Sequence, residues 1–168
     1  MKTPSLRSQP DVAQELGFLI MFVSNLEILF VPMMEALSSD DGMIAELIAL
    51  NVDNLTAKLT ILFRLAEQKA ASDPLARAIL DASEHVKKAV AYRNTLAHSL
   101  YVFDDATGVF ELYSNLLTER RGKPKCEPLK ASDVNRHSSA LEAAIIKVIE
   151  VGGDRLRNPL DASPQARA

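Results

Sequence analysis

Cysteine and aromatic residues are scarce in this chain. Its 168 residues include one cysteine, no tryptophan, three tyrosines and six phenylalanines. Because Cys126 has no second cysteine to pair with, a disulfide framework and a zinc site built on cysteines are excluded. The small number of aromatic rings also argues against a base-stacking platform of the kind that binds single-stranded nucleic acids.

Glycine and proline are also few, with six and eight residues. The chain is 48% hydrophobic and 24% charged, which is too apolar for a mainly disordered protein and sufficient for the core of one domain. Its abundant Ala and Leu residues are strong helix formers. The composition therefore predicts a helical domain.

Positive charge is missing from one part of the chain and concentrated in another. Residues 8–57 contain no Lys or Arg, whereas residues 120–130 contain Arg120, Arg121, Lys123, Lys125 and Lys130. Because Lys and Arg neutralise phosphate groups, we take the first four of these cations as candidate RNA-binding residues. A solvated loop without a ligand is the alternative interpretation.

One apolar stretch, residues 16–34, has the length of a membrane span. Ser24, Asn25, Glu27 and Pro32 interrupt it, and no cations flank it. We therefore expect a buried amphipathic helix and no membrane partner. The polar N-terminal residues do not resemble a signal peptide, and with one cysteine the expected compartment is the cytoplasm.

Hydrophobic spacing predicts four helices, over residues 12–37, about 43–70, 74–96 and 132–152. Pro32 should kink or interrupt the first helix. Aromatic and β-branched runs on both sides of a turn predict a β-hairpin at residues 100–113, which a basic loop at 118–131 follows. The expected fold class is all-α, a four-helix up-and-down bundle with a small β-hairpin inserted before the last helix. This domain would span residues 11–153, between a flexible arm (1–10) and a disordered tail (154–168).

The end of the third predicted helix carries three polar residues that suit RNA cleavage. Arg93 continues the apolar stripe of this helix, where an unpaired charge is costly. Asn94 and His98 are four positions apart and share one helix face. A histidine near its free pKa of roughly 6.5 can move the proton of a ribose 2′-OH. An arginine can bind the attacked phosphate with forked hydrogen bonds, and an asparagine can orient either group.

This stretch resembles the signature of the HEPN superfamily, in which an Arg and a polar residue precede a His after a short gap. Here the signature is Arg93, Asn94 and His98. The resemblance covers the four predicted helices. It implies a commonly dimeric helical bundle that acts as a metal-independent endoribonuclease, without cofactor, in toxin–antitoxin, phage-defence or RNA-processing systems. It also implies that Arg93 and His98 are catalytic and that Asn94 supports them.

A non-catalytic function remains the alternative, because many HEPN domains serve as binding or dimerisation modules. In an antitoxin-like or regulatory module, Arg93 would pair with an acidic residue and His98 would interact with the helix dipole. An open cleft beside Arg93 and His98 would favour the enzyme, and buried pairs would favour the module. A DNA-binding regulator ranks below both, because the sequence lacks a compact helix–turn–helix signature.

The remaining candidates are weaker. The three histidines show no metal-ligand spacing, so no metal site is expected. His85 lies near the helix face of Arg93 but is expected to be a half-exposed surface residue, and His137 is expected to face solvent. We interpret Cys126 as an incidental thiol, although neighbouring cations could make it reactive.

The sequence also predicts partners. The last two predicted helices carry apolar residues beside the stripe that would face the core. Such surplus apolar surface commonly binds a partner, so we expect a two-fold homodimer that joins two Arg93–His98 regions. The surplus apolar residues are Val90, Ala91, Ile145 and Ile146. Besides RNA, the resemblance to the HEPN superfamily implies an antitoxin or a nucleotidyltransferase as a partner.

Overall fold

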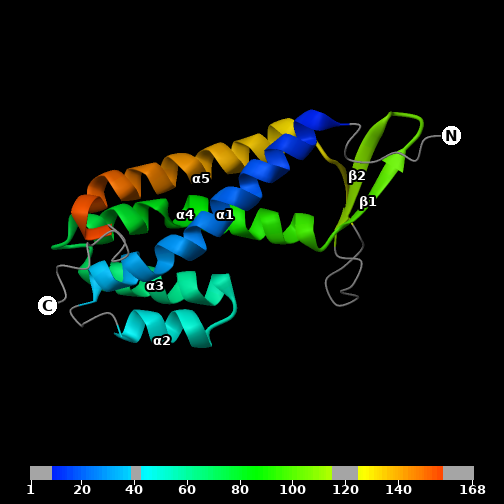
Figure 1. Cartoon of the computed structure of the whole chain (residues 1–168). Coiled ribbons are helices and arrows are strands. Elements are labelled where there is room, and N and C mark those ends of the chain that lie inside the picture. The colour runs from blue at the N-terminus through cyan, green and yellow to red at the C-terminus, as the bar shows by residue number, and fades with distance from the viewer. Residues whose placement is uncertain (1–8, 39–42, 115–124, 157–168) are drawn as a thin grey trace, which may run out of the picture. The chain divides into compact units, whose positions relative to one another are not determined.

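The protein is mostly helical, with one small antiparallel sheet (Figure 1). The computed structural model describes residues 9–38, 43–114 and 125–156. In chain order its elements are α1 (Pro10–Leu37), α2 (Met43–Asn51), α3 (Leu55–Lys69), α4 (Pro74–Ala97), β1 (Leu100–Asp104), β2 (Val109–Ser114), β3 (Lys125–Pro128), α5 (Ala131–Gly152) and the 3-10 helix η3 (Gly153–Leu156).

The chain divides into two compact units. We call residues 1–23 and 87–141 the sheet unit, and residues 24–86 and 142–168 the helical unit. Helices α1, α4 and α5 each contribute residues to both units.

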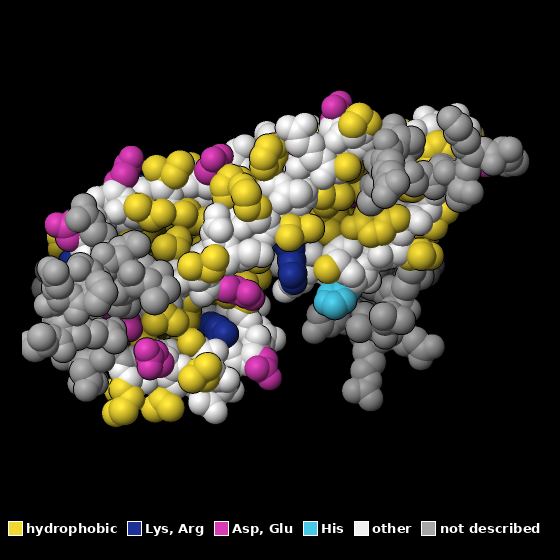
Figure 2. Space-filling view, viewed as in Figure 1, with side chains coloured by type: hydrophobic (Ala, Val, Ile, Leu, Met, Phe, Trp, Pro, Cys, Tyr) yellow, Lys and Arg dark blue, Asp and Glu magenta, His cyan; other side chains and the backbone are white. Residues whose placement is uncertain are grey.

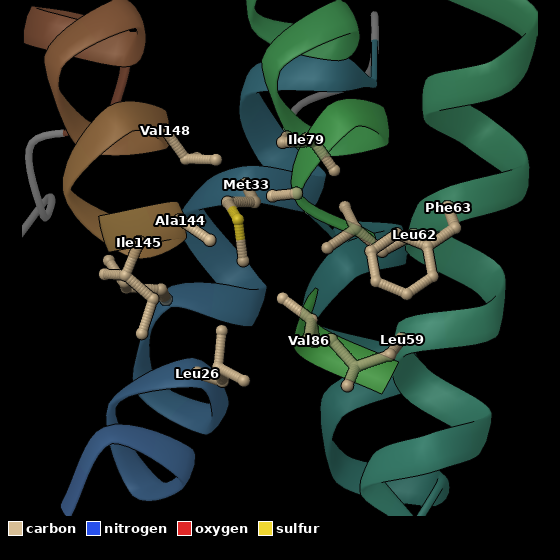
Figure 3. A pocket seen from close by; sticks show the side chains of 12 residues that line it. Leu26, Met33, Leu59, Leu62, Phe63, Ile79, Val86, Ala144, Ile145 and Val148 are labelled. Carbon is tan, nitrogen blue, oxygen red and sulfur yellow. The ribbon is translucent and has the colours of Figure 1, made fainter. Parts of the chain in front are cut away.

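The core of the helical unit consists of apolar side chains from four helices (Figure 3). Helical spacing places these residues on one face of each helix, so their burial follows from the sequence pattern. They line a cavity of only about 20 Å³, which is a packing defect too small to hold an organic ligand. Its lining includes Leu26 and Met33 of α1, Leu59, Leu62 and Phe63 of α3, Ile79 and Val86 of α4, and Ala144, Ile145 and Val148 of α5.

The helix predicted for residues 43–70 is wrong as a single element, because it divides into α2 and α3. Asn54 causes the break. Its backbone is extended, and its side chain accepts hydrogen bonds from the backbone N–H groups of Thr56 (2.8 Å) and Ala57 (3.3 Å). An asparagine in this arrangement caps a new helix. Of the two effects expected of Pro32, a kink or an interruption, the interruption is wrong, since α1 continues through this residue.

Most large apolar side chains of α2 are exposed. Ala45 is its buried residue, whereas Met43, Ile44, Leu47 and Leu50 are exposed. Leu50 is 78% exposed. Figure 2 shows hydrophobic and acidic side chains scattered over the face in view, with few basic ones. Among the described residues, α1 alone has the length and composition of a membrane span, and 28% of that span is buried.

Within the tail predicted to be disordered from residue 154, residues 154–156 belong to η3, and Leu156 is buried in the helical unit. The rest of this predicted tail lies outside the described residues. Arg155 makes η3 part of the fold. Its guanidinium donates to both carboxylate oxygens of Asp73 at 2.8 Å and to the carbonyl oxygen of Ala36 at 2.5 Å. Asp73 also accepts from the backbone N–H of Leu75, so it caps α4. Arg155 therefore links η3 to the ends of α1 and α4.

We expect Arg155→Ala to lower the free energy of unfolding by about 1 kcal/mol. A hydrogen bond to a charged group contributes more than a neutral one, but exposure to solvent reduces its value, and the Arg155 side chain is 45% exposed. The matched control is Lys147→Ala, whose ion pair with Asp81 spans 3.9 Å between two exposed side chains. Urea denaturation of both variants at pH 7 measures the difference, and equal effects would contradict the prediction.

The same contact predicts a pH dependence. The hydrogen bonds from Arg155 lower the pKa of Asp73 from 3.8 to about 2. Because the pKa in the folded protein lies below the unfolded value, the ionised carboxylate stabilises the fold fully above about pH 4. That contribution is lost as the pH falls toward 2. Melting temperatures of the wild type and Arg155→Ala should therefore differ at pH 7 and converge near pH 2.

The predicted hairpin is confirmed, but it belongs to a three-stranded sheet in the order β1-β2-β3. Its turn depends on Asp104, whose carbonyl accepts from Gly108 and whose carboxylate accepts from Ala106 and Thr107. Gly108 has a φ of 69°, which glycine adopts most easily. The third strand, β3, lies within the region predicted as a basic loop. It pairs with β2 in antiparallel register, with Leu112 opposite Glu127 and Tyr113 opposite Cys126.

Candidate functional site

The end of α4 holds the three residues that the sequence singled out. The backbone N–H of His98 donates to the carbonyl oxygens of Asn94 (3.1 Å) and Thr95 (3.3 Å). The helical turn therefore persists through His98, one residue beyond the last residue of α4. Asn94 and His98 consequently share one face of the helix, as their spacing predicted.

Arg93 is half-buried in the sheet unit. Its Nη1 donates to Asn94 Oδ1 at 3.1 Å. Within the described residues no carboxylate lies within 4 Å of the guanidinium, so the ion pair expected of a purely structural Arg93 is not found there. The remaining N–H groups of the guanidinium are thus available for an anion.

A groove of about 310 Å³ lies beside Arg93. Leucine side chains of α1 and α4 form much of it, and Leu19 and Leu96 are buried. The hydroxyl of Tyr101 donates to the carbonyl oxygen of Leu96 at 2.7 Å, which holds this ring at the end of α4. The full lining is Leu16, Leu19, Ile20, Arg93, Leu96, Ala97 and Tyr101.

His98 is exposed and is not part of the groove lining. In the described part of the chain its imidazole forms no hydrogen bond with Arg93 or Asn94. The site thus consists of an arginine held by an asparagine at an apolar groove, with an exposed histidine one helical turn beyond the asparagine. This arrangement can bind an anion and leaves an imidazole in contact with solvent.

A second histidine, His137, is half-buried, although its sequence position predicted a side chain facing solvent. His137 stacks on Tyr92, with ring centroids 4.2 Å apart and an interplanar angle of 24°. Burial lowers the pKa of His137, and the neighbouring Arg136 lowers it further. Burial also raises the pKa of Tyr92. Tyr92 precedes Arg93 directly, but nothing in the sequence indicates that α5 would bring a histidine to it. His85, in the helical unit, is exposed.

Cys126 lies beside an acidic side chain, which does not favour the reactive thiolate form of the cysteine. Its Sγ lies 3.0 Å from an Oε2 atom of Glu111 that also accepts from the Tyr113 hydroxyl. Tyr113 lowers the pKa of the thiol, but Glu111 and desolvation outweigh this effect, so the net shift is upward. Hydrogen bonds with Cys126 and Glu111 raise the pKa of Tyr113 to about 12. A thiol with a raised pKa is a poor nucleophile, which agrees with the interpretation of an incidental cysteine.

The candidate RNA-binding cations fall largely outside the described residues. This applies to Arg120, Arg121 and Lys123. Lys125 begins β3, where its backbone pairs with Ser114. In the described segments, no group of three or more His, Cys, Asp or Glu side chains could hold a metal ion.

The apolar positions that predicted a homodimer are only partly on the surface. Val90 and Ile145 are buried within the chain, at 4% and 8% exposure, so they offer no surface to a partner. Ala91 and Ile146 are exposed. The homodimer therefore remains a prediction, and two of the four residues on which it was based are exposed.

Comparisons with models of protein families, with curated proteins and with solved structures found no match for this chain.

Proposed function

We propose that this protein is a metal-independent endoribonuclease of the HEPN type that acts as a toxin or defence component. The observation that carries the proposal is the state of Arg93, which borders an open groove and has no carboxylate partner among the described residues. An unpaired, half-buried arginine is costly to maintain, so it is expected where a ligand supplies the anion. His98 follows on the next helical turn.

In this mechanism the 2′-OH of the RNA attacks the adjacent phosphorus. His98 accepts the proton of the 2′-OH, a bond forms between the 2′ oxygen and phosphorus, and the bond from phosphorus to the 5′ oxygen breaks. The leaving 5′ oxygen takes up a proton, from the imidazolium or from water. Arg93 binds the phosphate oxygens, on which charge accumulates, and Asn94 holds the guanidinium in place. The products are a 2′,3′-cyclic phosphate and a 5′-OH.

We also propose the corresponding fold and setting. In a HEPN-like four-helix bundle, α1, α3, α4 and α5 would be the four helices and α2 an addition. The protein would act in the cytoplasm as a homodimer, with an antitoxin or a nucleotidyltransferase as its partner.

A non-catalytic HEPN-like interaction module is the second candidate. The exposed apolar side chains of α2 favour it, because uncovered apolar surface of this kind commonly binds another protein. The lack of a described contact between His98 and Arg93 is also compatible with a site that binds without reacting.

Cleavage of RNA in EDTA separates the two functions. The purified chain is incubated with end-labelled RNA, with and without EDTA, and the product ends are analysed. We expect equal rates and 2′,3′-cyclic phosphate ends, because the proposed chemistry uses the 2′-OH rather than a metal-bound hydroxide. Loss of cleavage in EDTA, or products with 3′-OH ends, would contradict the proposal. Binding without any cleavage would favour the module.

The basic residues predict a salt dependence of RNA binding. Each neutralised phosphate contributes about 0.7 to the slope of log K against log salt for a single strand. Replacing Arg120, Arg121, Lys123 and Lys125 together by Ala should therefore reduce this slope by up to about 3. The control replaces Arg64 and Lys147, two exposed cations of the helical unit, and should leave the slope nearly unchanged. Fluorescence anisotropy at several salt concentrations measures both. An unchanged slope in the fourfold variant would identify the segment as a connector.

A further inference from the structure

The groove of the sheet unit combines an aliphatic lining with a single charged group. Arg93 is the one side chain that is charged at neutral pH among its lining residues, which otherwise are Leu, Ile, Ala and Tyr. Apolar surface remains uncovered at the groove, since Ile20 is 52% exposed. A volume of about 310 Å³ is within the range of sites that bind small organic molecules. The groove is thus large enough and apolar enough to hold a ligand.

The polar groups of the lining limit what that ligand is. The Tyr101 hydroxyl already donates to the Leu96 carbonyl, so it is not a free donor for a ligand. A nucleobase or a peptide backbone placed against this lining would leave polar edges without partners, which costs free energy. An aliphatic chain has no such groups and gains free energy for each methylene that it buries.

The charge of Arg93 indicates the other end of the ligand. Its guanidinium is half-buried, and its described hydrogen bond is the one to Asn94. Guanidinium and carboxylate groups form paired, charge-assisted hydrogen bonds. We propose that the groove binds a small amphiphile, an unbranched aliphatic chain with a terminal carboxylate that pairs with Arg93. This binding does not depend on RNA cleavage, although a bound carboxylate would compete with an RNA phosphate if the proposed function holds.

Titration with saturated carboxylates of increasing length tests the proposal. The full chain is titrated with carboxylates of about six to twelve carbons, below their micelle concentrations, and binding is followed by calorimetry and by backbone amide shifts. We expect each added methylene to lower Kd about fourfold until the groove is full. Alcohols of equal length should bind the wild type at least about tenfold more weakly than the carboxylates do. The carboxylates should likewise bind Arg93→Gln at least about tenfold more weakly than the wild type, because in each case one charge of the pair is missing.

Two variants separate the groove from other apolar surface. Ala97 is an exposed lining residue, so Ala97→Trp should obstruct the groove without disturbing the core. Ala91, exposed on the same helix and outside the lining, provides the control Ala91→Trp. We expect the first variant to lose carboxylate binding and the second to retain it.

Three outcomes would overturn the proposal. They are equal binding by Ala97→Trp and the wild type, equal binding of alcohols and carboxylates, and no dependence of Kd on chain length. Saturation of the groove by a mononucleotide or by a second copy of the chain, without carboxylate binding, would assign it to that occupant instead. None of these results depends on whether the protein cleaves RNA.

Discussion

His98→Ala is expected to lower the rate of RNA cleavage by about 10²–10⁴-fold, the usual contribution of a general acid or base. His98 is exposed at the end of α4, and its side chain has no hydrogen bond within the described residues. Its removal should therefore leave the fold intact, and the melting temperature of the variant should equal that of the wild type. Cleavage of labelled RNA under single-turnover conditions measures the effect.

The matched control for this variant is His85→Ala. His85 is an exposed histidine of the same helix, but it belongs to the helical unit. It should be replaceable without loss of activity. If His98→Ala cleaves RNA as fast as the wild type, the enzymatic function is wrong and the interaction module is the remaining candidate.

Arg93→Lys is expected to lower kcat by about 10²–10³-fold, the range found when one donor to a developing charge is removed. Lysine keeps the positive charge and an aliphatic stem, but it cannot form the forked pair of hydrogen bonds with a phosphate. It also loses the planar geometry of the guanidinium that donates to Asn94 Oδ1. Because the charge remains, the loss should appear in kcat more than in KM.

Asn94→Ala is the companion variant for Arg93→Lys. It leaves the guanidinium in place and removes the one described hydrogen bond that orients it. We expect a loss of about fivefold, smaller than that of Arg93→Lys, since a single neutral acceptor contributes about 1 kcal/mol. Full activity of Arg93→Lys would show that Arg93 acts only as a charge. If both variants bind RNA equally more weakly than the wild type and keep its kcat, Arg93 contributes to RNA binding rather than to catalysis.

Helix positions and local turns followed from the sequence because the interactions that decide them join residues a few positions apart. The buried stripe of α4, which includes Ile79 and Val86, repeats at helical spacing and was predicted correctly. The helical arrangement of Asn94 and His98 depends on an i to i+4 hydrogen bond and was also predictable. The hairpin turn is set by Asp104 and Gly108, which are nearly adjacent in the chain.

The break before α3 was missed although its signal is local. Asn54 caps α3 through its own side chain, but the apolar pattern on both sides favoured one uninterrupted helix. The exposed apolar face of α2 was missed for another reason. A hydrophobic pattern indicates which face prefers burial, but it does not determine whether enough neighbouring chain is present to cover that face.

The features that distinguish the candidate site were decided by the tertiary structure. The groove brings α1 residues such as Leu16 beside Arg93, which lies far along the chain. The Tyr92–His137 stack and the contact of Arg155 with Asp73 likewise join distant positions. Such contacts depend on how helices pack, and periodicity within one helix carries no information about its neighbour. The sequence by itself therefore determined helices α1, α4 and α5, the hairpin turn and the spacing of Arg93, Asn94 and His98. Only the packing of α1 against α4 decided that Arg93 borders an apolar groove, because a groove is formed by residues that the chain brings together from separate elements.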